Sequence, residues 1–180
     1  MTKKVVIISS SLRTGSNSEI LAREADRGAA EAGNEVEFIS LKDKDIRFCK
    51  GCLACQKTMK CVIRDDMNDL IEKIRTADAL IFATPIYYYE LSGQLKTFLD
   101  RCNPLYPAKN NFRDVYLITT AYDDAENASE TAVKGMQAWL SCFEQSRLAG
   151  TLFAGGLEAP KDASKHTTLL EKAYALGKNI

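Results

Sequence analysis

Four cysteines lie close together between residues 49 and 61, as Cys49, Cys52, Cys55 and Cys61. Their spacing is C-x2-C-x2-C-x5-C. Three thiolates with two residues between neighbours turn inward on a tight loop, and a fourth completes the tetrahedral set that an iron-sulfur cluster requires. Zinc also accepts four thiolates, but structural zinc sites usually pair two short knuckles separated by a longer stretch. Three interpretations stay open: a cluster, reduced thiols with a packing or redox role, and zinc.

A second group of polar residues follows the first apolar run of the chain. Residues 9–18 read SSSLRTGSNS and continue into a helical pattern. Hydroxyls, amides and a helix N-terminus favour phosphate, and Arg13 adds a charged donor. The alternative is a capped loop, in which Ser16 or Asn17 satisfies helix amides. Neither a G-x-G-x-x-G nor a G-x-x-x-x-G-K-[ST] motif occurs, so the loop suits a monophosphate ester such as the FMN tail.

Two further loops carry aromatic and polar residues after apolar runs. Residues 84–93 read TPIYYYELSG, and residues 119–124 read TTAYDD. Aromatic side chains and exposed amides suit a flat heterocycle that is contacted on its face and its edge. We also expect at least one of the three consecutive tyrosines to pack against another subunit.

Alternating apolar segments predict the scaffold that positions these loops. The expected strands are residues 4–9, 35–41, 79–83, 115–119 and 151–154, and the expected helices are residues 17–32, 67–74, 92–102, 127–145 and 164–176. The third strand is expected to end at residues 84–85, because proline cannot donate to a central ladder.

Strict alternation of strands and helices with short connections requires right-handed parallel crossovers. The sequence therefore predicts an α/β fold with a doubly wound five-stranded parallel sheet and helices on both faces. We expect one domain over residues 1–180, with a cysteine-rich loop at 47–64. In such sheets ligands bind beyond the carboxyl ends of the strands, where the strand order reverses.

Composition excludes several classes of partner. The 24 basic and 24 acidic side chains balance, so no overall field attracts nucleic acid or an anionic membrane. No segment approaches the ~20 apolar residues that span a bilayer, and we expect a soluble cytoplasmic protein. In that compartment cysteines stay reduced, and the isolated Cys102 and Cys142 are expected to be small buried hydrophobes.

Two kinds of catalysis lack the residues they need. No cysteine is followed six residues later by arginine, which excludes a C-x5-R phosphate loop. The only histidine, His166, lies in the last predicted helix, far from the loops, and is expected at the surface. Cys-His and Ser-His-Asp mechanisms therefore have no evident base.

Three segments together resemble a known family. The polar residues of 11–18, the TPIYY run and the helix SGQLKTFLDR at 92–101 are similar to the NADPH-dependent FMN reductase and iron-sulfur flavoprotein family, which is flavodoxin-like. The likeness covers the chain to about its fifth strand. One departure is Leu12, where related loops often carry proline.

The resemblance implies a role for each matching position. The FMN phosphate would be held by Ser11, Arg13, Ser16, Asn17 and Ser18. The isoalloxazine ring would be bordered by Pro85, Ile86, Tyr87 and Tyr88, with Thr120 and Ala121 in a third flavin loop. The cysteine spacing and its position after the second strand also resemble the cluster motif of the iron-sulfur flavoproteins.

The expected function is an FMN-dependent NAD(P)H oxidoreductase that passes electrons to a small-molecule or protein acceptor. Under the cluster interpretation, a four-iron four-sulfur centre is a second carrier. No catalytic side chain is required, because the flavin supplies the redox chemistry. The alternative is a non-enzymatic flavodoxin-type carrier, which is usually strongly acidic. The three tyrosines offer more aromatic surface than one flavin covers, so we expect a homodimer or homotetramer.

Overall fold

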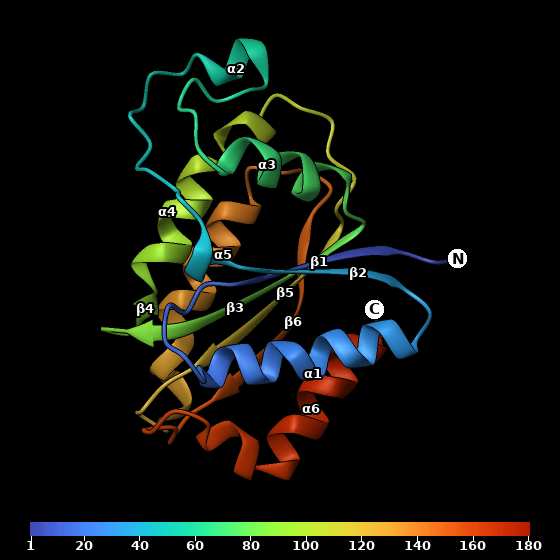
Figure 1. Ribbon diagram of the computed structural model, residues 1–180, viewed down its shortest axis with the longest axis vertical. Helices are drawn as coiled ribbons and strands as arrows, with labels where there is room; N and C mark the ends of the chain where they lie inside the picture. Colours follow the sequence, from blue (N-terminus) through green and yellow to red (C-terminus); the bar gives the residue numbers. More distant parts are fainter.

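The parallel strands follow the order β2-β1-β3-β5-β6 in the computed structural model, which describes residues 1–180 (Figure 1). The strands are β1 (Lys4–Ser9), β2 (Glu35–Ser40), β3 (Ala79–Tyr87), β5 (Asp114–Thr120) and β6 (Arg147–Ala154). The chain leaves β1 for β2 on one side and returns to β3 on the other, so the strand order reverses beside β1. The predicted doubly wound sheet with five parallel strands is confirmed.

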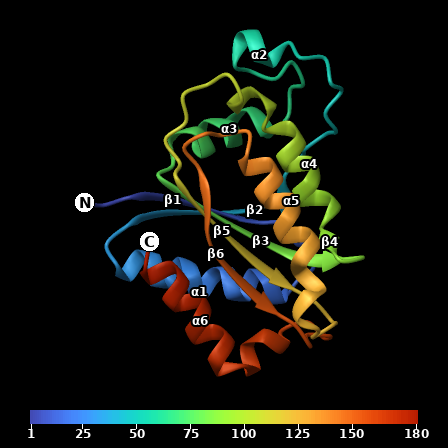
Figure 2. The ribbon, with the colours of Figure 1, turned by 180° about the vertical axis from the view of Figure 1, so that it is seen from behind.

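Helices cover both faces of this sheet (Figures 1 and 2). One face carries α1 (Asn17–Glu31) and α6 (Thr167–Lys178), and the other carries α3 (Met67–Thr76), α4 (Gly93–Arg101) and α5 (Glu130–Leu140). The short turns are η1 (Leu41–Asp43), α2 (Cys55–Thr58), η2 (Asn103–Leu105), η3 (Glu126–Ser129) and η4 (Asp162–Lys165). Because both faces are covered, the central strands are near-continuous apolar runs. No helix combines the length and apolar character needed to cross a bilayer.

The third strand extends further than predicted. β3 continues through Pro85 to Tyr87 and then pairs with a short antiparallel strand, β4 (Glu90–Leu91). The prediction that proline ends the strand was wrong, because β1 pairs with β3 only as far as Ala83. Beyond that residue, the missing N–H of Pro85 no longer interrupts a ladder on the β1 side.

Other differences lie towards the C-terminal half of the chain. The helix expected at residues 127–145 divides into η3 and α5, and α5 ends at Leu140. Cys142 therefore lies beyond the helix and is exposed, so its prediction as a buried hydrophobe was wrong, whereas Cys102 is buried as expected. His166 is exposed at the start of α6, as expected.

Candidate functional site

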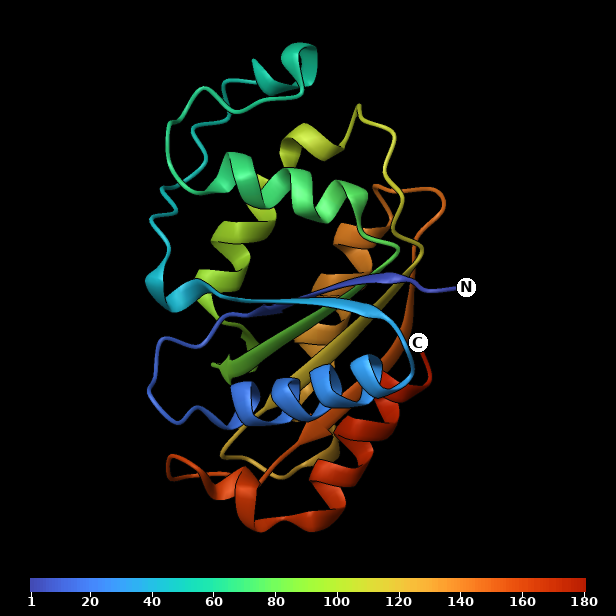
Figure 3. The same cartoon turned by 45° about the vertical axis from the view of Figure 1, so that its right-hand side comes forward.

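Three loops meet where β1, β3 and β5 end, beside the reversal of strand order (Figure 3). A buried network of hydroxyl groups fixes two of them. The Ser10 and Ser92 hydroxyl oxygens lie 3.0 Å apart, and Thr84 Oγ1 donates to Ser92 Oγ at 3.1 Å. Ser92 also caps α4, because its Oγ accepts the N–H of Leu95 at 3.3 Å. This network was not predicted from the sequence, although the helix start near Ser92 is a visible signal for part of it.

The first loop leads directly into the N-terminus of α1. Ser16 is the N-cap: its Oγ accepts the N–H of Glu19 at 3.4 Å and lies 3.0 Å from the Ser18 hydroxyl. The backbone N–H groups of Asn17 and Ser18 have no hydrogen-bond partner within the chain. The capped-loop alternative therefore describes the Ser16 side chain. The capped helix still offers the free backbone donors that bind phosphate.

Ser11 and Arg13 lie on the same loop in different environments. Ser11 is buried, and its Oγ accepts the backbone N–H of Arg13 at 3.3 Å. The Arg13 side chain is exposed, and its guanidinium donates to the carbonyl of Glu158 at 3.4 Å. A charged donor therefore lies on the loop that leads into the free amides of α1.

A fourth segment, residues 155–163 after β6, lies against the first loop. Its sequence contains no motif that predicts this position. The Asn17 side chain holds it: Nδ2 donates to the carbonyl of Ala159 at 3.0 Å, and Oδ1 accepts the N–H of Ala163 at 3.0 Å. Both polar groups of this amide are therefore occupied. Asn17 can therefore donate to an anion through its backbone N–H but not through its side chain.

The second loop is a tight hairpin at the end of β3. Pro85 and Ile86 are half-buried, whereas Tyr87 and Tyr89 are exposed and Tyr88 is 100% exposed. Tyr88 and Tyr89 form its two-residue turn with φ values of 51° and 64°. Side chains are unfavourable in this left-handed region, and such turns usually contain Asn-Gly.

The third loop contacts the hairpin through its acidic end. Thr120 and Ala121 are buried, and the Tyr89 hydroxyl donates to Asp123 Oδ2 at 2.9 Å. This bond raises the pKa of Tyr89, while the N–H of Ala125 and the Tyr89 hydroxyl lower the pKa of Asp123. A cavity of about 590 Å³ opens here, lined by Tyr89, Tyr122, Asp123, Asp124, Gly156 and Glu158.

The four clustered cysteines lie apart from these loops. Cys49 and Cys52 are exposed, Cys61 is half-buried and Cys55 is buried. The structure brings no three histidine, cysteine or acidic side chains together as a metal-binding group. The side chains are of the kind that binds a cluster, but in this arrangement they do not gather around one point.

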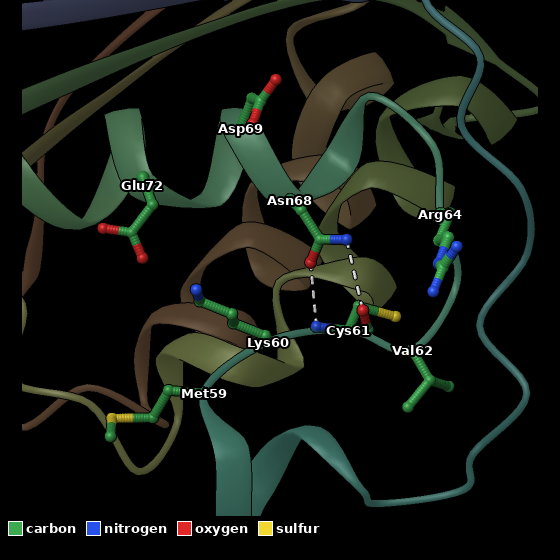
Figure 4. Close-up of a pocket in the computed structure, with 8 residues that line it drawn as sticks. All are labelled: Met59, Lys60, Cys61, Val62, Arg64, Asn68, Asp69 and Glu72. Atoms are coloured by element: carbon green, nitrogen blue, oxygen red, sulfur yellow. Dashed lines mark hydrogen bonds between the residues drawn. The ribbon is translucent and has the colours of Figure 1, made fainter.

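Two asparagines outside the cysteine spacing hold two of these cysteines. Asn68 on α3 accepts the N–H of Cys61 at 2.9 Å and donates to the carbonyl of Cys61 at 3.2 Å (Figure 4). It also donates to the carbonyl of Ile63 at 3.1 Å. The Asn103 Nδ2 group donates to Cys55 Sγ at 3.3 Å. Burial raises the pKa of the Cys55 thiol, and this N–H offsets part of the rise.

A buried ion pair closes the cysteine-rich loop, residues 47–64. Arg101 at the end of α4 donates to both carboxylate oxygens of Asp65, at 2.6 and 2.9 Å, and to the carbonyl of Arg47 at 2.6 Å. Neither ion-pair side chain is exposed. The Asp65 hydrogen bond raises the pKa of Arg101, and Cys61 lies close enough to add to this rise.

Helix α4 separates the two groups of residues. Ser92 at its N-terminus lies at the edge of the sheet where the three loops meet, whereas Arg101 and Asn103 at its other end contact the cysteine-rich loop. Nine helical residues rise about 14 Å along the axis. The three loops and the cysteine-rich loop therefore lie at opposite ends of this helix, as Figure 1 shows.

Comparisons with known proteins identify the class. The family model described as NADPH-dependent FMN reductase matches residues 3–154. An iron-sulfur flavoprotein of Methanocaldococcus jannaschii is 32% identical over 98% of this chain and 95% of its own length. An iron-sulfur flavoprotein of Methanosarcina thermophila is 39% identical over 54% of this chain and 51% of its own length. The NAD(P)H:quinone oxidoreductase structure from Methanothermobacter marburgensis covers 99% of this chain and 97% of its own, with a TM-score of 0.74 and 18% identity.

The matching fold and sequence thus define an NAD(P)H-dependent flavin oxidoreductase with a flavodoxin-like sheet. The chain belongs to the NADPH-dependent FMN reductase family. The family resemblance stated from the sequence is confirmed.

Proposed function

We propose that the three loops bind FMN and that electrons pass through it from NADH or NADPH to a small-molecule or protein acceptor. The phosphate would bind at the first loop, and the ring would lie beside Pro85, Ile86 and the third loop. FMN supplies the hydride and electron chemistry when bound. The protein's residues hold the cofactor and limit the access of water to it.

The free backbone donors at the start of α1 carry this proposal. The N–H groups of Asn17 and Ser18 have no partner in the chain, and Arg13 lies on the same loop. Helix N-termini favour anions through both these donors and the helix dipole. The buried hydroxyl network then holds the ring-side loop at a fixed position relative to the phosphate side.

Fluorescence titration of FMN into the protein tests this site. Replacing Ser11 and Arg13 together with alanine should weaken FMN binding by about tenfold or more, because a charge-assisted phosphate contact is lost. Arg147→Ala is the control, since this exposed arginine begins β6 at the opposite edge of the sheet. Unchanged affinity in the double variant would contradict the proposed phosphate site.

We further propose that Cys49, Cys52, Cys55 and Cys61 ligate an iron-sulfur cluster. The four thiols and the anchored positions of Cys55 and Cys61 support this. In addition, Arg101 offers a buried cation beside Cys61, and its Nε has no hydrogen-bond partner. Ligation requires the four thiols to come together, because no three of them form a metal-binding group in this arrangement.

Anaerobic reconstitution tests the cluster. The protein should then contain iron and labile sulfide in equal amounts, and serine at any one of the four positions should sharply reduce both while FMN binding persists. Cys142→Ser is the matched control, because Cys142 is an exposed cysteine outside the loop. Reconstituted protein with no iron above background would rule out the cluster and leave a flavin reductase.

We also propose that the chain forms a homodimer or homotetramer through the tyrosine hairpin. Tyr88 is fully exposed on a turn with unfavourable backbone angles, and Tyr87 and Tyr89 are exposed beside it. Large exposed aromatic patches usually mark interaction surfaces. Light scattering at micromolar concentration should show an assembly that Tyr88→Ser weakens. A wild-type monomer would contradict this proposal.

A further inference from the structure

We propose that Lys161, which lies outside all three flavin loops, is a further ligand of the flavin phosphate and distinguishes FMN from riboflavin. The inference rests on the proposed FMN site and adds a residue to it. The contacts between residues 155–163 and the first loop support it.

The backbone of Lys161 is attached directly to the phosphate loop. Its N–H donates to the carbonyl of Gly15 at 2.9 Å. Two residues to either side, the carbonyl of Ala159 and the N–H of Ala163 are held by the Asn17 side chain. Lys161 is therefore positioned by the same residues that form the start of α1.

The side chain of Lys161 lies along Gly15. A Cβ atom at Gly15 would be 3.1 Å from Lys161 Cγ and 3.3 Å from Cε, and Gly15 has a φ of +69°. Any larger residue there would therefore meet the lysine side chain as well as an unfavourable backbone conformation. Since Nζ is bonded to Cε, the ammonium group is held beside the loop that offers its amides to an anion.

Lys161 is held in this position without a carboxylate partner. Its own φ is 68°, in the left-handed region that side chains disfavour. The acids nearest in sequence are Glu158, which is exposed, and Asp162, which pairs with Lys165 at 2.8 Å and accepts the N–H of Ala159. Lys161 itself takes part in no ion pair. An unpaired cation in an unfavourable conformation indicates a functional position.

The charge of the ligand explains the need for a second cation. A phosphate monoester carries roughly −1.5 to −2 charges at pH 7. Arg13 supplies one positive charge, and its guanidinium already contacts the carbonyl of Glu158. Lys161 supplies a second charge beside Gly15, and a lysine ammonium suits this role because it acts as a compact point charge.

Titrations with two flavins test the inference. FMN and riboflavin share the ring and differ in the phosphate, so only FMN reports on Lys161. In Lys161→Met, which keeps the chain that covers Gly15, FMN affinity should fall about tenfold while riboflavin affinity stays unchanged. Lys161→Arg should retain most of the affinity for FMN, and the wild-type preference for FMN should decrease with added salt.

Lys165→Met is the matched control, because this exposed lysine lies four residues away and is already paired with Asp162. It should bind both flavins like the wild type. If Lys161→Met lowers the affinity for FMN and for riboflavin equally, or lowers neither, the inference is overturned. This holds even if the Ser11 and Arg13 double variant loses affinity for FMN alone. A wild-type protein with no preference for FMN over riboflavin would overturn both this inference and the proposed phosphate site.

Discussion

Replacing Asp65 with asparagine tests how the cysteine-rich loop is closed. The asparagine keeps the size of the side chain but removes the negative charge that Arg101 contacts at 2.6 and 2.9 Å. Arg101 has no exposed side-chain surface and cannot turn into solvent. The variant therefore leaves a buried guanidinium without its counter-charge.

Breaking a buried ion pair on one side typically costs about 3–5 kcal/mol, because the remaining charge is uncompensated. We expect Asp65→Asn to lose about 3 kcal/mol of unfolding free energy, since asparagine retains one acceptor oxygen. For a chain of this size, that corresponds to a fall in the melting temperature of roughly 6–12 °C.

The pH dependence follows from the pKa of Asp65. Burial raises this pKa, but hydrogen bonds from Arg101 and from the N–H groups of Arg47 and Met67 lower it, and the net shift is downward. A carboxyl group whose pKa is lower in the folded state contributes stability above its unfolded pKa, and this is lost as pH falls through the folded value. The difference in unfolding free energy between wild type and Asp65→Asn should therefore be constant above about pH 4, which is near the pKa of aspartate in the unfolded chain. Below that pH the difference should shrink.

Urea denaturation followed by the fluorescence of Trp139 measures both effects, because it is the only tryptophan and packs against Phe82 and Phe112. Asp100→Asn is the matched control on the same helix. Its carboxylate pairs with Lys96 on an exposed face, and its loss should cost no more than about 0.5 kcal/mol. A cost below about 1 kcal/mol for Asp65→Asn, or an unchanged difference at pH 3, would refute the reasoning.

Three further predictions concern other parts of the fold. Iodoacetamide should label the exposed Cys142 in the folded protein but not Cys102, whose thiol pKa is raised by complete burial; peptide mass spectrometry would detect early labelling of Cys102. Ser92→Ala should cost about 1–2 kcal/mol in urea denaturation, because it removes the cap of α4 and two hydroxyl contacts. Tyr88→Asn, which leaves the Tyr89–Asp123 hydrogen bond in place, should gain about 1 kcal/mol under monomeric conditions, and a loss would show that Tyr88 makes a stabilising contact.

The sheet could be predicted because its central strands are buried on both faces. Runs such as residues 5–8 and 79–83 therefore contain almost no polar residue, and this pattern is readable without tertiary information. The β4 strand could not be predicted in this way. Its turn consists of Tyr88 and Tyr89, which carry none of the usual signals for a turn with positive φ.

In the candidate site, too, some features could be predicted from the local sequence and others depend on tertiary contacts. The free amides near Ser16 follow from a cap at a helix start, which is a local signal. Lys161 has no local signal, because its relation to Gly15 depends on how the end of the chain folds back onto the first loop. The exposure of Cys142 was mispredicted because the apolar pattern continues past Leu140, where the helix ends.

The closed neck of the cysteine-rich loop makes the loop a separable module. The N–H of Asp45 donates to Asp66 at 2.8 Å and the N–H of Arg47 donates to Asp65 at 3.0 Å, so the chain enters and leaves the loop at neighbouring points. A short turn could join these points without moving the sheet or α3. The length and sequence of this loop can therefore change without altering the edge of the sheet where the three loops meet.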